Sequence, residues 1–85
     1  MLTPKQAADA ARRYEPSLTI TYCCDYDKDF YIFTMLKNPK ERDINDPFYA
    51  VSKKDGTVYN FSPSSDLRKF GEAMDNRAIP LSALK

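Results

Sequence analysis

Two short, largely apolar runs stand out in the second half of the chain. The runs are 48–51 (FYAV) and 58–61 (VYNF), and a turn segment, 53–56 (KKDG), separates them. Asp-Gly between two such runs predicts a β-hairpin, because glycine adopts the positive φ that hairpin turns require. We therefore expect a hairpin over 46–63 with a three-residue loop, in which Gly56 is left-handed.

The length of this loop determines how the two strands pair. Three loop residues would place Lys53 opposite Thr57, Val51 opposite Tyr59 and Tyr49 opposite Phe61. Because side chains alternate along a strand, this register predicts one wholly apolar face. Its members are Tyr49, Val51, Tyr59 and Phe61. We expect this face to belong to the core, and function to lie on the opposite face, in the loop 37–45 or in the C-terminal tail.

A helix is predicted at the N-terminus. Thr3 is suited to cap it, Pro4 to occupy its first turn, and Gln6 to complete a capping box. Ala7, Ala11 and Tyr14 recur at helical spacing and share one face. The helix should end before Pro16, because the residue that precedes a proline is disfavoured in the α conformation.

Two further strands follow the helix. Residues 18–24 alternate, which predicts one face turned to the core and the other to solvent. The inward set is Leu18, Ile20, Tyr22 and Cys24, and the outward set is Thr19, Thr21 and Cys23. Residues 30–36 are apolar on both faces. This pattern predicts a central strand that is covered on both sides, or one whose outer face meets a partner.

The remaining pattern predicts a second helix and a tail. Residues 62–66 offer several caps, Leu67, Phe70 and Met74 form an apolar stripe, and Asn76 is a stop signal. Residues 77–85 are expected to form an extended tail. The predicted fold class is α+β in a single domain over 1–85. It consists of an N-terminal helix, a four-stranded antiparallel sheet of two hairpins and a C-terminal helix, with both helices on one face of the sheet.

Composition restricts the functional classes. The 85 residues include 13 basic and 12 acidic ones, a net charge of +1, which favours neither nucleic acid nor an acidic membrane surface. No apolar run reaches the roughly 20 residues that span a bilayer, and the N-terminus has no apolar signal core. We expect no membrane association, and a location in the cytoplasm of a bacterial host or in a virion.

Candidate catalytic and metal-binding residues are few. The chain has no histidine, which excludes His-based catalysis and most zinc sites. Cys23 and Cys24 are adjacent, so we expect two reduced thiols on opposite strand faces, one in the core and one outside. The serines lack an activating base and are better explained as caps. We therefore predict a protein that is not an enzyme and has no catalytic residue, cofactor or metal.

The segment Asp25-x-Asp27-x-Asp29 resembles the opening of a calcium-binding loop. Such a loop requires glycine at its sixth position and a bidentate glutamate at its twelfth. Here there is no glycine at the sixth position, and Leu36 occupies the twelfth. We therefore expect a solvated hairpin turn.

Apolar and basic residues outside the predicted core are the candidates for an interface. The set comprises Phe48, Lys37, Lys40, Arg42, Ile44, Ile79 and Leu81. An alternative is that the basic members and Lys53-Lys54 form a patch beside Tyr49 and Tyr59, which would stack nucleobases. Interleaved acidic residues weaken that alternative, because they cancel the positive field.

Residues 45–67 (NDPFYAVSKKDGTVYNFSPSSDL) resemble a recurring segment in small proteins of tailed phages and prophages of Gram-positive bacteria. Those proteins carry an apolar strand, a lysine-rich turn that ends in glycine, a second strand that ends in Phe-x-Pro, and then a helix. The resemblance implies a role in virion assembly or in host interaction.

Two other families have a similar layout. Small bacterial immunity proteins, which neutralise partner toxins, share the leading helix, the two hairpins and the final helix. PepSY domains place a helix before a strand meander with a turn similar to Asp55-Gly56-Thr57-Val58-Tyr59. PepSY domains are typically secreted or membrane-linked inhibitory modules, and the chain lacks their export signal. None of these families supplies a catalytic motif for this sequence.

The sequence thus predicts a non-enzymatic protein–protein interaction domain. We expect a phage or prophage accessory or structural protein that binds a virion component or a second copy of itself. The alternative is a soluble inhibitor or immunity protein that blocks a bacterial enzyme or toxin. A small nucleic-acid binder is the third alternative.

Overall fold

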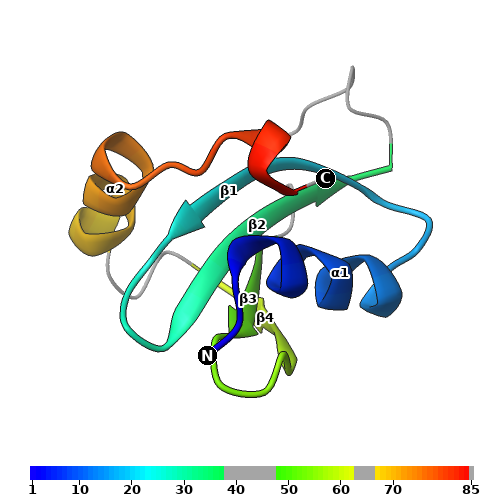
Figure 1. The fold of residues 1–85 in the computed structure, drawn as a ribbon. Coiled ribbons are helices and arrows are strands. Elements are labelled where there is room, and N and C mark those ends of the chain that lie inside the picture. Colours follow the sequence, from blue (N-terminus) through cyan, green and yellow to red (C-terminus); the bar gives the residue numbers. More distant parts are fainter. Residues whose placement is uncertain (38–47, 63–66, 85) are drawn as a thin grey trace.

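A computed structural model describes residues 1–37, 48–62 and 67–84. Its elements are α1 (Pro4–Tyr14), β1 (Thr19–Asp25), β2 (Phe30–Leu36), β3 (Phe48–Ser52), β4 (Val58–Phe61), α2 (Leu67–Asn76) and the 3₁₀ helix η2 (Leu81–Leu84). The four strands form one antiparallel sheet in the order β1-β2-β3-β4 (Figure 1). The predicted α+β class and the order α-β-β-β-β-α are confirmed.

The start of α1 follows from its first residues. The Thr3 hydroxyl accepts a hydrogen bond from the Gln6 amide at 3.2 Å, and the Gln6 side chain accepts one from the Thr3 amide at 2.9 Å. This capping box pairs two backbone donors that a helix would otherwise leave unsatisfied. Three small residues, Ala7, Ala8 and Ala11, are fully buried, so α1 lies close against the sheet.

The two helices cover opposite faces of the sheet, and the prediction that both lie on one face was wrong (Figure 1). The first core lies under α1 and η2 and contains Ala7, Ala8, Ala11, Ile20, Cys23, Tyr31, Phe33, Met35, Tyr49, Val51 and Leu84. The second lies under α2 and contains Cys24, Tyr26, Ile32, Ala50, Phe70 and Ala73. The physical reason is that β2 and β3 are apolar on both faces, so one layer of helices would leave apolar surface in water.

Of the two alternatives predicted for residues 30–36, the structure bears out the central strand that is covered on both sides. On β2, Phe33 packs in the first core and Ile32 in the second, and both are fully buried. Its neighbours are β1 on one side and β3 on the other.

An irregularity in β1 changes which of its residues face each core. Ile20 pairs with Met35, but Tyr22 already pairs with Thr34, so Thr21 is an extra residue in the ladder. A bulge of this kind shifts the alternation by one position. As a result Ile20 faces the first core, whereas Tyr22 packs against the second.

The predicted inward set of this strand was therefore wrong in part. Cys23 lies in the first core and Cys24 in the second, and both are fully buried. The two thiols do occupy opposite faces, as expected. The expectation that one of them would lie outside failed because both faces of the sheet are covered.

The β3–β4 hairpin has a register one residue away from the predicted one. Val51 pairs with Val58, and Ala50 pairs with Tyr59. The loop is residues 53–56, closed by a hydrogen bond from the Ser52 amide to the Thr57 carbonyl at 2.9 Å. The loop therefore has one residue more than we predicted.

That single residue moves the side chains of β4 to the other face. Tyr49 and Val51 belong to the core, as predicted, and lie under α1, but Phe61 packs against the second core, under α2. Tyr59, expected in the core, is on the same face as Phe61 and is 50% exposed. The predicted four-residue apolar face is thus divided between the two sides of the sheet.

Gly56 has φ +78°, so its predicted left-handed conformation is confirmed. We expect Gly56→Val to lower the free energy of unfolding by about 2 kcal/mol, because a β-branched residue is strained at positive φ. An added Cβ would also lie 3.2 Å from Leu2 Cδ1. Chemical denaturation measures the effect.

The matched control for Gly56→Val is Gly71→Ala. Gly71 lies inside α2, and nothing would come within 4 Å of an added Cβ there. Alanine should therefore raise the free energy of unfolding by up to about 1 kcal/mol. Equal stability of Gly56→Val and the parent chain would show that the hairpin does not depend on a left-handed residue.

The second helix packs through a stripe shifted from the predicted one. Phe70 and Ala73 are buried and Met74 is partly buried, whereas Leu67, predicted to lie in the stripe, is 67% exposed. The Tyr22 hydroxyl donates to the Met74 carbonyl at 2.9 Å, which ties α2 to β1. Burial raises the pKa of Tyr22 to about 12, so this donor keeps its proton at neutral pH.

The C-terminal segment docks onto the chain's own sheet. The Asp25 amide donates to the Arg77 carbonyl at 3.0 Å, and the Ile79 amide donates to the Cys23 carbonyl at 2.9 Å. Ala78 thereby pairs with Cys24 on the outer edge of β1. Beyond Pro80 the segment turns into η2, whose Leu84 is buried in the first core.

Candidate functional site

The predicted interface residues that the structure describes do not gather into one surface. Phe48 contacts Phe70 edge to face, with ring centroids 5.0 Å apart, and so helps to hold α2. Ile79 packs against the first core, and Leu81 is 43% exposed. Lys37 is exposed at the end of the first described range. Three further predicted residues lie outside the described residues; they are Lys40, Arg42 and Ile44.

A different surface brings aromatic residues together on the α2 side of the sheet. It is an open apolar hollow of about 270 Å³, which we name the Ala50 hollow. Its lining is Tyr26, Asp27, Phe30, Ile32, Ala50, Tyr59, Asn60 and Phe61. Among these residues Asp27 is the only charged one, and its carboxylate is paired with Lys69 at 3.0 Å.

Cross-strand pairing explains why the hollow forms. Ile32 pairs with Ala50, and Ala50 pairs with Tyr59, so the three side chains form one row across the sheet. Alanine is the smallest member of this row and leaves space above it. The hollow is therefore a gap in this row, with Ala50 as its floor and the larger side chains of Ile32 and Tyr59 on either side.

Aromatic contacts form the walls. Phe30 and Tyr59 meet edge to face at 6.0 Å on one side. Tyr26 and Phe61 meet at 5.2 Å on the other. Phe70 of α2 packs on Phe61 at 5.8 Å. The helix therefore covers the neighbouring part of this face and leaves Tyr59 half exposed beside the hollow.

The hollow adjoins the outer edge of β4. The closing bond between Ser52 and Thr57 makes Ala50–Tyr59 and Phe48–Phe61 the hydrogen-bonded pairs of the ladder. The N–H and C=O groups of Val58 and Asn60 then point away from β3. Within the described ranges, no other segment pairs with this edge.

The edge of β4 is short, but it carries no charge, proline or bulge that would prevent pairing with another strand. Residues 57–62 (TVYNFS) contain no charged residue and no proline. Natural edge strands are commonly protected by lysine, proline or a bulge. The outer edge of β1 differs, because residues 77–79 cover its end and Thr21 interrupts its ladder.

Sequence reasoning missed this site, although one signal for it was present. Ala50 is the one small residue among residues 48–51 of β3, where the other three side chains are aromatic or branched. Only the correct register shows that it lies beside Tyr59.

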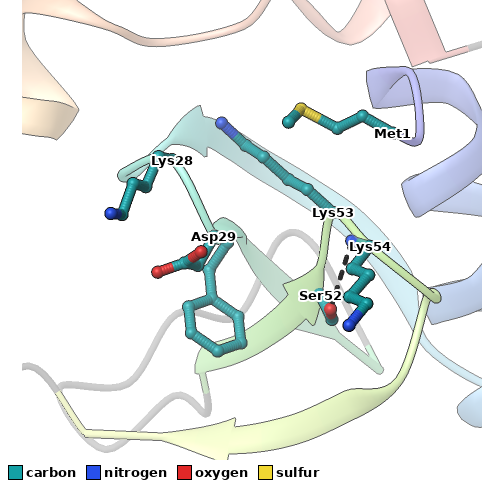
Figure 2. A pocket seen from close by; sticks show the side chains of 7 residues that line it. Met1, Lys28, Asp29, Ser52, Lys53 and Lys54 are labelled. Atoms are coloured by element: carbon teal, nitrogen blue, oxygen red, sulfur yellow. Dashed lines mark hydrogen bonds between the residues drawn. The ribbon is translucent and has the colours of Figure 1, made fainter.

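A second hollow, of about 560 Å³, lies at the other end of the same hairpin. Its lining is Met1, Lys28, Asp29, Phe30, Ser52, Lys53 and Lys54 (Figure 2). Figure 2 shows that the side chains of Lys53 and Lys54 point in different directions. Lys54 is exposed, whereas Lys53 is only 6% exposed.

Lys53 is a structural cation. Its Nζ forms an ion pair with Asp25, donates to the Asp27 carbonyl, and lies 4.7 Å from the centre of the Tyr31 ring. Its backbone accepts from the Leu2 amide at 2.7 Å and donates to the Asp29 carbonyl at 2.9 Å. Lys53 therefore contributes no exposed charge to the basic patch of the nucleic-acid alternative. Tyr49 is buried as well and has no free face for a base.

The Asp25-x-Asp27-x-Asp29 segment acts as a turn, as predicted. Asp27 Oδ1 accepts from the amides of Asp29 and Phe30 at 2.8 Å and 2.9 Å. Burial, the largest contribution, favours a higher pKa for Asp27, but hydrogen bonds from Asp29, Lys69 and Phe30 together lower the pKa. Within the described part of the chain, no three His, Cys, Asp or Glu side chains are arranged to hold a metal ion.

The two thiols are chemically protected. Burial raises the pKa of Cys23 to about 12 and that of Cys24 to about 11. Only about 10⁻⁴ and 10⁻³ of these groups would be thiolate at pH 8, and the thiolate is the nucleophile. We expect a thiol reagent such as Ellman's reagent to react with neither cysteine on the timescale of minutes in the folded chain. Both should react within seconds in denaturant, and rapid stoichiometric labelling of the native protein would contradict the described burial.

None of the described helices combines the length and the apolar character that a transmembrane segment requires. Comparisons of the chain with protein-family models, with curated proteins and with solved structures found no match. The resemblance of residues 45–67 to phage proteins therefore stays a prediction.

Proposed function

We propose that this chain is a non-enzymatic protein-binding domain whose partner binds at the outer edge of β4 and over the Ala50 hollow. The observation that carries the proposal is the juxtaposition of an uncharged strand edge, with which no described segment pairs, and a half-exposed aromatic residue, Tyr59. Tyrosine and phenylalanine are enriched at the centres of protein interfaces, and charged residues are depleted there.

The dimensions of the hollow favour a protein partner over a small-molecule ligand. A volume of about 270 Å³ lies below the range of roughly 300–1,000 Å³ that is typical of small-molecule sites. Such a hollow can hold one or two apolar side chains of a partner, which is how interface anchors are commonly seated.

The partner that we propose is a protein of the virion or of the host. The resemblance of residues 45–67 supports a virion component or a host protein as the partner, in a phage or prophage accessory or structural role. Identification of a toxin or a host enzyme as the partner would instead favour the inhibitor or immunity role.

Site-specific photo-crosslinking tests the proposal. A photoreactive phenylalanine analogue is placed at Tyr59, and at Arg13 as the control, because Arg13 is exposed on α1 on the opposite face. We expect a protein that crosslinks from position 59 and not from position 13. Binding of that protein in purified form should weaken at least about tenfold in Tyr59→Asp, the loss expected of an interface hot spot. Equal crosslinking from both positions, or unchanged affinity of Tyr59→Asp, would overturn the proposal.

A further inference from the structure

We propose that the partner binds as an extended peptide that adds a fifth strand to the sheet along β4, with an apolar side chain seated in the Ala50 hollow. This inference rests on the proposed function and specifies how the partner is recognised. The expected partner segment is uncharged at its centre and carries a bulky apolar residue.

Strand geometry supports this mode of binding. The outward-facing N–H and C=O groups of Val58 and Asn60 present the donors and acceptors that a neighbouring strand would use. The four residues of β4 span about 13 Å, at about 3.3 Å per residue. Backbone hydrogen bonds provide affinity in such complexes, and pockets for alternate side chains provide specificity.

Side-chain alternation connects the edge to the hollow. A strand that lies beside β4 continues the row of Ile32, Ala50 and Tyr59 by one more side chain. Asn60 also lines the hollow, although alternation directs its side chain to the opposite face. The main chain of β4 therefore forms this part of the rim, and a bulky side chain of an added strand would reach the hollow by crossing β4 beside Tyr59.

The opposite edge of the same sheet already accepts a short extended segment. Residues 77–79 pair with the end of β1 through two backbone hydrogen bonds, and Ile79 packs against the first core. The sheet is thus extended there by a peptide with one apolar anchor. The β4 edge offers the same combination of free backbone groups and an apolar recess.

The available area favours a peptide over a second copy of the chain. Pairing two four-residue strands would bury a few hundred Å², well below the roughly 1,200–2,000 Å² of a stable protein–protein interface. The charge pattern supports an uncharged occupant, because residues 57–62 are uncharged and Asp27 is already paired with Lys69.

A library of random linear peptides, displayed and selected against the purified chain, provides the probe. The selected sequences should share one bulky apolar residue in an extended segment whose successive side chains point to opposite faces of the sheet. Amide NMR spectra of the chain with a synthetic selected peptide should show the largest shifts at Val58 and Asn60. N-methylation of peptide amides that face β4 should weaken binding about tenfold per bond, whereas N-methylation of the alternate amides should leave the affinity unchanged.

A filled hollow provides an independent test. Ala50→Leu places a larger side chain in the hollow and should weaken peptide binding at least about tenfold. Ala83→Leu is the matched control, because Ala83 is exposed in η2. If Ala50→Leu does not fold, the N-methyl series still decides the question.

Three outcomes would overturn the inference. They are failure to select a peptide, selected peptides that tolerate N-methylation at every position, and a concentration-dependent dimer of the chain that Tyr59→Asp abolishes. The first two leave the proposed function intact if the Tyr59 crosslink is found, because a folded partner could bind the same surface. Loss of the Tyr59-specific crosslink would remove the proposed function itself.

Discussion

A chain that ends at Asn76 is expected to be largely unfolded at room temperature. The removed segment includes Leu84, which is buried in the first core, and Ile79, which packs against that core. Burial of Leu84 contributes about 1.5–3 kcal/mol and that of the partly buried Ile79 about half as much, and each of the two backbone bonds to β1 contributes about 1 kcal/mol. The sum of about 4–6 kcal/mol equals much of the stability of a small domain, about 5–15 kcal/mol. Circular dichroism during thermal unfolding measures the loss.

Two point variants separate the contributions of this segment. Leu84→Ala should cost about 3 kcal/mol, because the side chain is 1% exposed, whereas Leu81→Ala should cost less than about 1 kcal/mol. A truncated chain that keeps its melting temperature and loses only a partner would show that the tail is an interface and not part of the fold.

Lys53→Ala is expected to lower the free energy of unfolding by about 3 kcal/mol. The substitution removes the buried half of an ion pair, a hydrogen bond to Asp27 and the cation above the Tyr31 ring. Removal of one partner from a buried pair costs about 3–5 kcal/mol. The lower end applies because the side chain of Asp25 is 45% exposed and water can solvate its charge. Denaturation in urea measures the loss.

The adjacent residue is the control for Lys53→Ala. Lys54 is exposed, and Lys54→Ala should change the stability by less than about 0.5 kcal/mol. Lys53→Met keeps the apolar stem beside Tyr31 and should restore part of the loss. Equal effects of the substitutions at 53 and 54 would mean that the two lysines are equivalent, in disagreement with the described geometry.

The features that sequence reasoning predicted well depend on local chemistry. Thr3 and Gln6 form their capping box within one helical turn, and Gly56 adopts its positive φ within one loop. The two-sided apolar pattern of β2 also needs no knowledge of distant residues, because any strand that is apolar on both faces must be covered on both.

The errors came from choices that packing of distant residues decides. A loop of three residues and one of four both satisfy the Asp-Gly signal, and the choice inverts the faces of β4. Thr21 carries no sign in the sequence that it would be an extra residue in its ladder. The Ala50 hollow depends on the register and on the position of α2, so no local pattern could have revealed it.

The unequal edges of the sheet limit how this protein can assemble with itself. One lateral boundary is occupied by residues 77–79 and distorted at Thr21, which leaves β4 as the one boundary of the described sheet open to extension. Open-ended fibres require that every unit have two adhesive sides. Edge-to-edge growth of this sheet would therefore stop at a pair of chains. High protein concentration, or partial loss of the partner, should not join native sheets edge to edge into filaments.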